Sequence, residues 1–585
     1  AQLSRKGERQ PHWRAGGVLV QHLPPHGVRT MPDLPGDGDF SNPATADRDF
    51  KDSDPWTETR ALLVGSWRFH SSLIMDLAGP ENDLAAMETL VRGQGATDVT
   101  ILRNDGVSRT AVETALHALG LRSKPGDWIF FYYTGHGALA EATVKGTRDG
   151  DTDQFLPLPG FDPDHEDPER YIVDKDFYNW LARYVPRDVQ ILMMADTCHS
   201  GTMHRSVDPR AMGMTPRLTL AGRNVELTAR PSPRFASVLA SADSVGIAAT
   251  REDLPNLFFL SAAKDDQVAW ENALPAEGAP ARGFLTWSFE QGMTTVGANG
   301  KTWAADQNGD GVVSVGELGA YLNVQVRALS GQRQESNMVI PAGRDGQGLF
   351  ATVLPSPRPP APPLLPGLYV ADAKARASVT GDFPWRVLTD GKGADFVWDA
   401  GKQVMLRRTG DMVAQNVKTV SQVRGVMDNW AAMEALRPLL SERQARIMIG
   451  PLENGARYAS GAPVTLALSQ PAGGVEPGGD RYATVFNVAS DGTVQRLYPT
   501  TPADGDGKLA PGQTLPILES QVIAPYGTDH VVALVTPRPP EPFRLLLRTV
   551  ENQRAVDRLV TPIKDLLASA PGRASLSIGE LYTGN

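Results

Sequence analysis

Apolar runs of strand length alternate with amphipathic helical patterns through the first half of this 585-residue chain. A strand that is buried on both faces must be apolar at every position, so continuous runs of this kind are typical of parallel sheets. The alternation predicts an α/β fold in which helices flank a mostly parallel sheet. We expect strands at Ala61–Gly65, Asp98–Leu102, Trp128–Tyr133, Val189–Met194 and Leu257–Ala262, and helices at Glu81–Val91, Thr110–Leu119 (capped by Ser108) and Lys175–Tyr184.

A proline-rich segment ends this pattern. Residues 355–366 contain seven prolines, a composition that favours a stiff, extended spacer. Beyond it, period-two runs and the turn signal Ser490-Asp491-Gly492 predict a β-rich domain of the α+β or sandwich-like type. Its expected strands are Pro463–Leu468, Arg481–Val488, Thr493–Leu497 and Val531–Val535, and its expected helices lie near Asp428–Leu440 and Asn552–Leu567. The expected parts are an extended arm over 1–57 with one short strand at 17–20, an α/β domain over 58–354, a linker over 355–367 and the β-rich domain over 368–585.

Composition excludes several classes of function. The formal net charge of −10 argues against a nucleic-acid partner, and the apolar runs are too short for a transmembrane segment. The single cysteine, Cys198, permits neither an internal disulfide nor a thiolate zinc cluster. We expect a monomer, although the oligomeric state is otherwise open. The single thiol and the small-residue start at Ala1 favour a periplasmic or secreted location, with the cytoplasm left open.

Two expected strands run directly into glycine-containing turns that carry reactive side chains. One continues as Tyr133-Thr134-Gly135-His136-Gly137 and the other as Asp196-Thr197-Cys198-His199-Ser200-Gly201. Ligands bind at the carboxyl ends of the strands in an open parallel sheet, so both turns would face one crevice. There His136 could take the thiol proton and Cys198 could attack as the thiolate. A structural role for either residue, and His199 or His204 as the base, stay open as alternatives.

These motifs resemble those of the caspase-like cysteine peptidases, and within them the bacterial metacaspase-like (orthocaspase) branch. The segments Phe259–Gln267 and Gly283–Thr286 are similar to later family segments, and the likeness covers about residues 58–354. The resemblance implies a dyad with His136 as base and Cys198 as nucleophile, with the backbone N–H groups of Gly137 and Cys198 as the oxyanion hole. The C-terminal part is similar to an uncharacterised β-rich domain that follows bacterial caspase-like domains.

The resemblance also implies a substrate pocket with two carboxylates, which would select Arg or Lys before the scissile bond. Asp196 precedes the nucleophile by two residues, so period-two alternation puts both side chains on one side of the strand. Asp83, in Gly79-Pro80-Glu81-Asn82-Asp83, matches the second carboxylate, and Thr134 joins them as a substrate-binding residue. The expected partners are proteins or peptides with Arg or Lys at the cleavage site. The alternative for Asp83 is a helix-start residue without contact to substrate.

Residues 306–317 follow the twelve-residue spacing of a calcium loop. Gly311 stands at the sharp turn, and the exiting segment Glu317–Leu329 has a helical pattern, whereas the entering segment does not. We expect Ca²⁺ to stabilise the last helix rather than to activate the protein. The alternative is an acidic turn that binds no metal. The expected ligands are Asp306, Asn308, Asp310, the carbonyl of Val312, Ser314 and Glu317.

Two further expectations concern regulation. The resemblance places Asp151 and Asp174 in the family's activating calcium cluster, but Lys175 and Arg205 stand where its other acids are expected. Residues 202–234 carry six arginines just after Cys198, so this loop is a candidate for self-cleavage, the alternative being an ordinary basic surface loop.

The sequence therefore predicts a cysteine endopeptidase that hydrolyses bonds after Arg or Lys through an acyl-thioester. Two alternatives stay open. One is a non-catalytic calcium-binding scaffold that acts through its C-terminal domain. The other is a peptidase restricted to a single partner.

Overall fold

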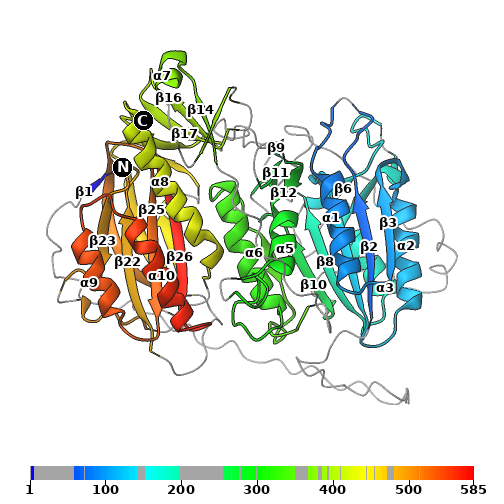
Figure 1. The fold of residues 1–585 in the computed structure, drawn as a ribbon. Coiled ribbons are helices and arrows are strands. Elements are labelled where there is room, and N and C mark those ends of the chain that lie inside the picture. The colour runs from blue at the N-terminus through cyan, green and yellow to red at the C-terminus, as the bar shows by residue number, and fades with distance from the viewer. Residues whose placement is uncertain are drawn as a thin grey trace, which may run out of the picture.

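The computed structural model describes residues 2–4, 58–71, 73–141, 152–165, 167–197, 215–216, 254–264, 267–275, 279–297, 300–349, 366–379, 385–389, 391, 394–408, 410–442, 445–452, 455–470, 480–501, 504–510, 512 and 514–584. The N-terminal arm apart from 2–4, the strand expected at 17–20, and linker residues 355–365 lie outside them. Figure 1 shows two groups of sheets and helices side by side.

A six-stranded sheet forms the first group, in the order β13-β10-β8-β4-β2-β3. Five strands run parallel, and the edge strand β13 (Asn337–Val339) is antiparallel to its neighbour. The mostly parallel sheet predicted from the continuous apolar runs is thereby confirmed, with ends that differ from the expected ones by two residues at most. The parallel strands are β2 (Thr59–Gly65), β3 (Asp98–Arg103), β4 (Trp128–Thr134), β8 (Gln190–Asp196) and β10 (Leu257–Ser261).

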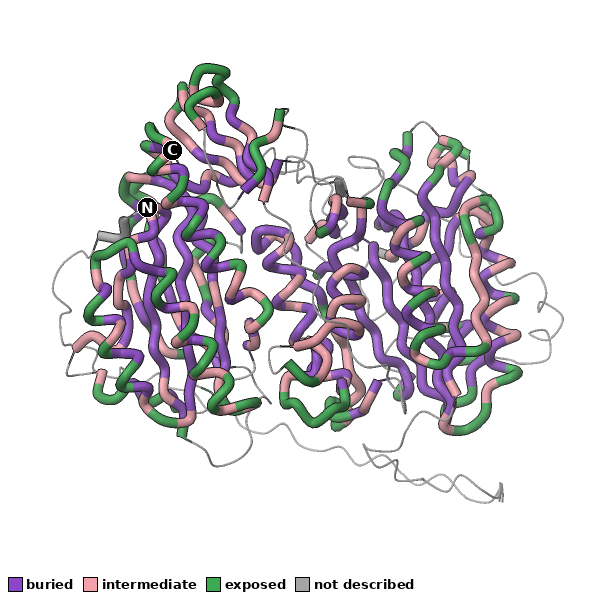
Figure 2. Tube along the Cα trace, in the orientation of Figure 1, coloured by how far each residue is buried: buried purple, intermediate pink, exposed green. Residues whose placement is uncertain are grey.

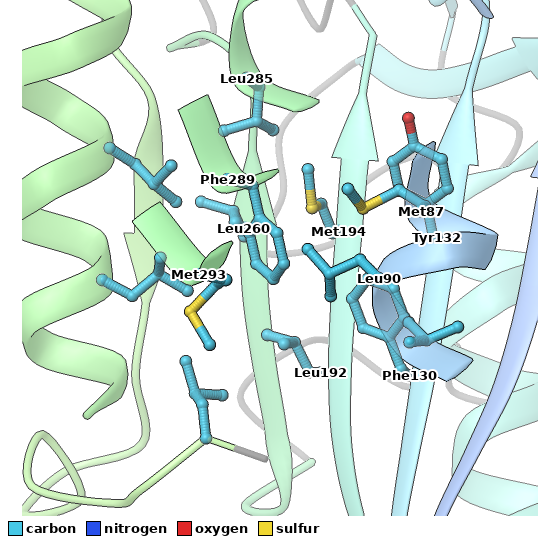
Figure 3. Packing of buried hydrophobic residues seen from close by; sticks show 14 of the residues in the cluster. Met87, Leu90, Phe130, Tyr132, Leu192, Met194, Leu260, Leu285, Phe289 and Met293 are labelled. Carbon is cyan, nitrogen blue, oxygen red and sulfur yellow. The ribbon is translucent and has the colours of Figure 1, made fainter. Parts of the chain in front are cut away.

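Helices cover both faces of this sheet, whose central strands are buried (Figure 2). Alternate strand residues belong to the cores on opposite faces. On one face, even-numbered residues of β4 and β8 pack with α1 (Pro80–Gly93), α5 (Phe284–Thr294) and α6 (Val315–Ser330). Figure 3 shows Phe130, Leu192 and Met194 of the strands among Phe289 and Met293 of α5 and Leu90 of α1. On the other face, odd-numbered residues pack with α2 (Arg109–Arg122) and α3 (Asp174–Tyr184). Because of this two-residue period, each side chain at a strand end faces one of the two helical layers, and its place in the strand decides which one.

The expected helices of this domain are present, and Ser108 caps α2 as predicted by accepting a hydrogen bond from the Ala111 N–H at 3.1 Å. The sequence pattern did not predict α5. Nearly all of its residues are buried or half-buried, so its polar and apolar positions do not segregate into the stripe that marks a surface helix.

The second group is β-rich, as expected, and its described residues form four helices and three sheets. Their orders are β1-β24-β21-β19, β15-β14-β16-β17-β18 and β20-β26-β25-β22-β23. The first strand, β1 (Gln2–Ser4), pairs with β24 (Thr514–Ile523), so the start of the chain lies on the C-terminal group. The remaining strands are β14 (Gly367–Val370), β15 (Arg386–Leu388), β16 (Phe396–Asp399), β17 (Val404–Arg407), β18 (Met412–Gln415), β19 (Arg446–Gly450), β20 (Arg457–Tyr458), β21 (Pro463–Ser469), β22 (Tyr482–Val488), β23 (Val494–Tyr498), β25 (Thr528–Thr536) and β26 (Ser575–Thr583).

Two helix boundaries in this group were wrong. The helix expected from Asp428 is α8 (Val420–Leu436), which begins earlier because Thr419 and Gln422 form a capping box. The helix expected from Asn552 is α10 (Asp557–Ser569), which begins later in the sequence. Asn552 itself has a φ of 61°, a value that a right-handed helix excludes. A separate helix, α9 (Glu541–Val550), precedes it, and the short α7 (Ala373–Ser378) follows β14.

The helix α6 lies between the two groups. Leu318 and Leu322 belong to the core of the six-stranded sheet, whereas Val324 packs in the core around α8 and α10. Buried ion pairs continue the contact at the end of α6, with Arg327 2.5 Å from Glu442, and Arg333 paired with Asp411. A helix that is buried all round serves two cores at once, so α6 couples the sheet domain to the C-terminal domain.

Glu335, just beyond α6, belongs to the same contact. Its carboxylate lies 2.6 Å from Lys264 Nζ and 3.1 Å from the guanidinium of Arg446 in the C-terminal domain. Burial alone would raise the pKa of Glu335, but the charges of Arg446, Arg327 and Lys264 outweigh it and lower the pKa to about 2. Glu335 is therefore a carboxylate at any ordinary pH.

No helix in the described part of the chain is long and apolar enough to cross a membrane.

Candidate active site

The site is built at the carboxyl ends of β4 and β8. These central strands pair in parallel through their last residues, where Thr134 lies opposite Asp196. Thr134, His136 and Asp196 are all fully buried. Cys198, the predicted nucleophile, comes two residues after the end of β8 and lies outside the described residues, as do the alternative bases His199 and His204.

The turn after β4 owes its shape to Gly135. A Cβ at this position would lie 2.7 Å from both the Ser66 carbonyl oxygen and the Tyr133 hydroxyl oxygen, so no larger residue fits. The Tyr133 hydroxyl in turn donates to the carbonyl of His136 at 3.2 Å, which fixes the main chain of that residue. The sequence Tyr133-Thr134-Gly135-His136 therefore folds into one defined turn that presents the imidazole.

A backbone carbonyl sets the tautomer of His136. The Nε2 atom lies 2.7 Å from the carbonyl oxygen of Met75, and because a carbonyl only accepts hydrogen bonds, Nε2 carries the hydrogen. In the neutral ring the lone pair is then on Nδ1, which is the basic nitrogen. Phe69 packs against the ring, with centroids 5.1 Å apart. Sequence reasoning missed Met75, because its contribution is a backbone atom 61 residues away in sequence.

Asp83, predicted to bind substrate, is fully buried and already engaged. Its Oδ1 accepts from Arg282 Nε at 2.7 Å, and its Oδ2 accepts from the Gly283 N–H at 3.0 Å and from the Thr134 hydroxyl at 3.5 Å. The structure thus brings Asp83 and Thr134 together, as expected. Asp83 also lies in the first turn of α1, so its role in substrate binding stays a prediction.

Asp196 lies on the face of the sheet that α1 and α5 cover. Its Oδ2 accepts from both the N–H (3.0 Å) and the hydroxyl (2.5 Å) of Thr286 at the start of α5. Because that hydroxyl donates to a carboxylate, the Tyr132 hydroxyl, 2.7 Å away, must donate to Thr286. This chain of hydrogen bonds holds Asp196 in a fixed orientation beneath the strand ends.

Arg282 and Thr286 are residues that sequence reasoning did not assign. Arg282 directly precedes the segment Gly283–Thr286 and Thr286 ends it. Arg282 donates to Asp83 and Thr286 donates to Asp196. Arg282 also donates to Glu290 at 2.9 Å. Although burial lowers the pKa of the Arg282 guanidinium, the charges of Asp83 and Glu290 raise it above its ordinary value. The sequence signal that could have pointed to Arg282 is an arginine directly before an apolar segment.

The predicted calcium loop has the expected turn, with Gly309 and Gly311 at φ of 78° and 88°. Asp306 accepts from the N–H groups of both glycines, at 2.7 and 2.9 Å. Glu317 forms a capping box with Ser314 and accepts from the Asn308 N–H at 2.9 Å. Among the described residues, no three His, Cys, Asp or Glu side chains are grouped so that they could hold a metal ion. The loop backbone fits the calcium motif, but its carboxylates are held by N–H groups rather than gathered around one point.

The other regulatory expectations fall mostly outside the described residues. Asp151, Arg205 and the loop 202–234 lie there, apart from the two-residue strand β9 (Thr215–Pro216). Asp174 and Lys175 are described at the start of α3, where Asp174 accepts a hydrogen bond from the Lys175 N–H at 2.8 Å. Lys175 is buried, and it occupies a position where the resemblance leads one to expect an acidic residue.

Part of the chain is similar to known proteins. Residues 59–206 match the family model described as metacaspase, peptidase C14 domain. Metacaspase-1 of Mycosarcoma maydis is 30% identical over 151 residues, covering 24% of this chain and 36% of the relative. Metacaspase-1 of Pyricularia oryzae is 28% identical (32% and 46%), and metacaspase-2 of Trypanosoma brucei brucei is 28% identical (26% and 45%). These relatives are fungal and trypanosomal, so the bacterial branch remains a prediction.

The similarity covers part of the molecule. The chain spans less than half the length of each of these three relatives. Among solved structures, caspase-1 of Spodoptera frugiperda aligns with 50% of this chain and 89% of its own, at 9% identity and a TM-score of 0.30. The family match includes the turn of His136 and the segment of Cys198, so residues 59–206 are similar to the metacaspase, peptidase C14 domain.

Proposed function

We propose that the chain is a cysteine endopeptidase with His136 as general base and Cys198 as nucleophile. The observation that carries the proposal is the placement of His136. Its Nε2 is tied to the Met75 carbonyl, its basic nitrogen is Nδ1, and β4 ends beside the strand that leads into Cys198. A buried imidazole with a fixed tautomer is what a thiol nucleophile requires of its base.

The proposed reaction is acyl transfer. His136 Nδ1 accepts the proton of the Cys198 thiol, and the thiolate attacks the scissile carbonyl carbon. Collapse of the tetrahedral intermediate breaks the C–N bond, and the protonated imidazole gives its proton to the leaving amine. Water then hydrolyses the thioester by the same proton route. Backbone N–H groups of Gly137 and Cys198 would stabilise the oxyanion.

The proposed specificity is for Arg or Lys before the scissile bond. Three polar residues near the strand ends support it, because Thr134 lies opposite Asp196 at the ends of β4 and β8 and its hydroxyl donates to Asp83 of α1. Carboxylates in a water-poor site favour a cation strongly.

A matched peptide panel tests the function. Peptides that differ only in having Arg, Lys or Asp before the scissile bond are incubated with wild type and with Cys198→Ala, with and without calcium. We expect Arg and Lys peptides to be cleaved by wild type alone. Equal cleavage by both proteins would reject the dyad, and preference for Asp would reject the specificity. No cleavage of any peptide would favour the scaffold or the single-partner peptidase. Nicking of wild type, but not of Cys198→Ala, within 202–234 would extend the activity to self-processing.

Calcium binding at residues 306–317 belongs to the same proposal, with a structural role. The loop spacing, its two left-handed glycines and its position directly before α6 support it. We expect calcium at about 100 times its Kd to stabilise the fold by about 2.7 kcal/mol, as a rise in melting temperature. Glu317→Gln is a sharp control, because glutamine keeps the capping box but loses the charge. An identical melting temperature with calcium and with chelator would contradict the proposal.

A further inference from the structure

Arg282 occupies a site that is built to hold a guanidinium. Its Nε lies 2.7 Å from Asp83 Oδ1, its Nη2 lies 2.9 Å from Glu290 Oε2, and its guanidinium carbon lies 5.5 Å from the centre of the Trp287 ring. The arginine side chain is 9% exposed and the aspartate is not exposed at all. Two carboxylates and an aromatic face are a favourable environment for a planar cation. We call Asp83, Glu290 and Trp287 the guanidinium site.

The guanidinium site adjoins the proposed catalytic base. The Thr134 hydroxyl donates to Asp83 at 3.5 Å, and Thr134 precedes His136 by two residues on the same chain. A cation bound at Asp83 therefore lies close to the turn that presents the imidazole.

The oxygens of Asp83 have little capacity for a second guanidinium. They accept from Arg282, from the Gly283 N–H at 3.2 and 3.0 Å, and from Thr134. Two carboxylates, Asp83 and Glu290, still meet at this position, an arrangement that attracts a cation. A substrate guanidinium can therefore be attracted to the site, but it can pair with Asp83 only by displacing Arg282.

The element that carries Arg282 is compatible with such an exchange. The strand β12 (Ala281–Gly283) has three residues and is the edge of a three-stranded sheet, next to β11 (Trp270–Ala273). Moving the side chain would leave the pairing of the central sheet intact. One guanidinium would replace another, so the hydrogen bond to Asp83 would be regained in the complex.

We propose that Arg282 is an internal competitor for the cationic side chain of the substrate, and that its displacement gates Arg and Lys specificity. This inference rests on the proposed function, since it concerns the pocket of the same peptidase. Arg282 thus acts as a specificity-determining residue that keeps Asp83 occupied until a basic substrate takes its place.

Selectivity kinetics test the proposal. Two peptides differ only before the scissile bond, with arginine in one and its uncharged analogue citrulline in the other. We expect Arg282→Gln to raise the ratio of the two kcat/KM values about tenfold over wild type, and Arg282→Lys, which keeps the charge, to stay nearer wild type. An unchanged or smaller ratio, with both peptides slowed alike, would mean that Arg282 is only structural and would overturn the proposal.

A binding measurement decides the question without hydrolysis. In the Cys198→Ala background, agmatine, a small guanidinium cation, is titrated calorimetrically. We expect Arg282→Gln to tighten agmatine binding about tenfold, and Asp83→Asn combined with Arg282→Gln to abolish it. The double variant removes both buried charges, so it is also the one that keeps its fold most readily. Equal agmatine affinity with and without Arg282 would overturn the proposal. Loss of peptide cleavage in every protein would refute the proposed function alone, because agmatine still reports on Arg282.

Discussion

Replacing His136 with alanine is expected to lower kcat on an Arg peptide by about a thousandfold or more, with a much smaller change in KM. The imidazole is the group proposed to take the thiol proton. Because it acts in the transition state and does not hold the bound substrate, its loss should lower kcat far more than it changes KM. Steady-state kinetics at several pH values measure the effect. In wild type the acidic limb of kcat/KM would report protonation of the base, and that limb should vanish in the variant.

A matched control separates catalysis from folding. His117→Ala removes an imidazole of α2 that packs on Tyr184, with ring centroids 4.6 Å apart, and that has no place in the proposed site. It should leave the pH profile unchanged. If His136→Ala keeps more than about a tenth of the wild-type kcat, the imidazole is not the base, and His199 or His204 would have to be tested in its place.

Asp83→Ala is expected to lower the free energy of unfolding by about 3–5 kcal/mol, because it leaves the guanidinium of Arg282 buried and without its main counter-charge. Glu290 would remain as a partner, but it lies nearer the surface, with 19% of its side chain exposed. Denaturant unfolding at neutral pH measures the change.

The control for this prediction is the double variant Asp83→Ala with Arg282→Met. Removing both charges should recover most of the lost stability, since no unpaired ion is left in the interior. A double variant as unstable as Asp83→Ala would show that Asp83 contributes through Thr134 and Gly283 rather than through its ion pair with Arg282.

The sheet domain could be predicted from sequence because its signal is local. Each parallel strand is apolar throughout, so β2, β4 and β8 stand out as runs bounded by turns. Helix α5 carries no such signal. It packs so closely on α6 that a Cβ at Gly292 would lie 2.8 Å from the Tyr321 ring, and a glycine within an apolar stretch does not by itself indicate a helix.

The candidate site also contains some residues that the local sequence indicates and some contacts that it does not. His136 and Asp196 could be singled out from the sequence because they lie at the carboxyl ends of strands, Asp196 as the last residue of β8 and His136 two residues after β4. Arg282 was missed because its partner Asp83 is 199 residues away in sequence, and only the fold brings the two together. The Met75 carbonyl was missed because any residue type can supply it. Long-range pairing and backbone contacts are the parts of a site that a single sequence does not encode locally.

Covalent labelling shows whether His136 activates Cys198. Wild type is treated with a peptidyl acyloxymethyl ketone that ends in arginine, and intact mass and peptide mapping locate and time the adduct. We predict one adduct per chain at Cys198, formed at least about a hundredfold more slowly in His136→Ala. No adduct at Cys198, or labelling at the same rate in both proteins, would mean that His136 does not activate Cys198.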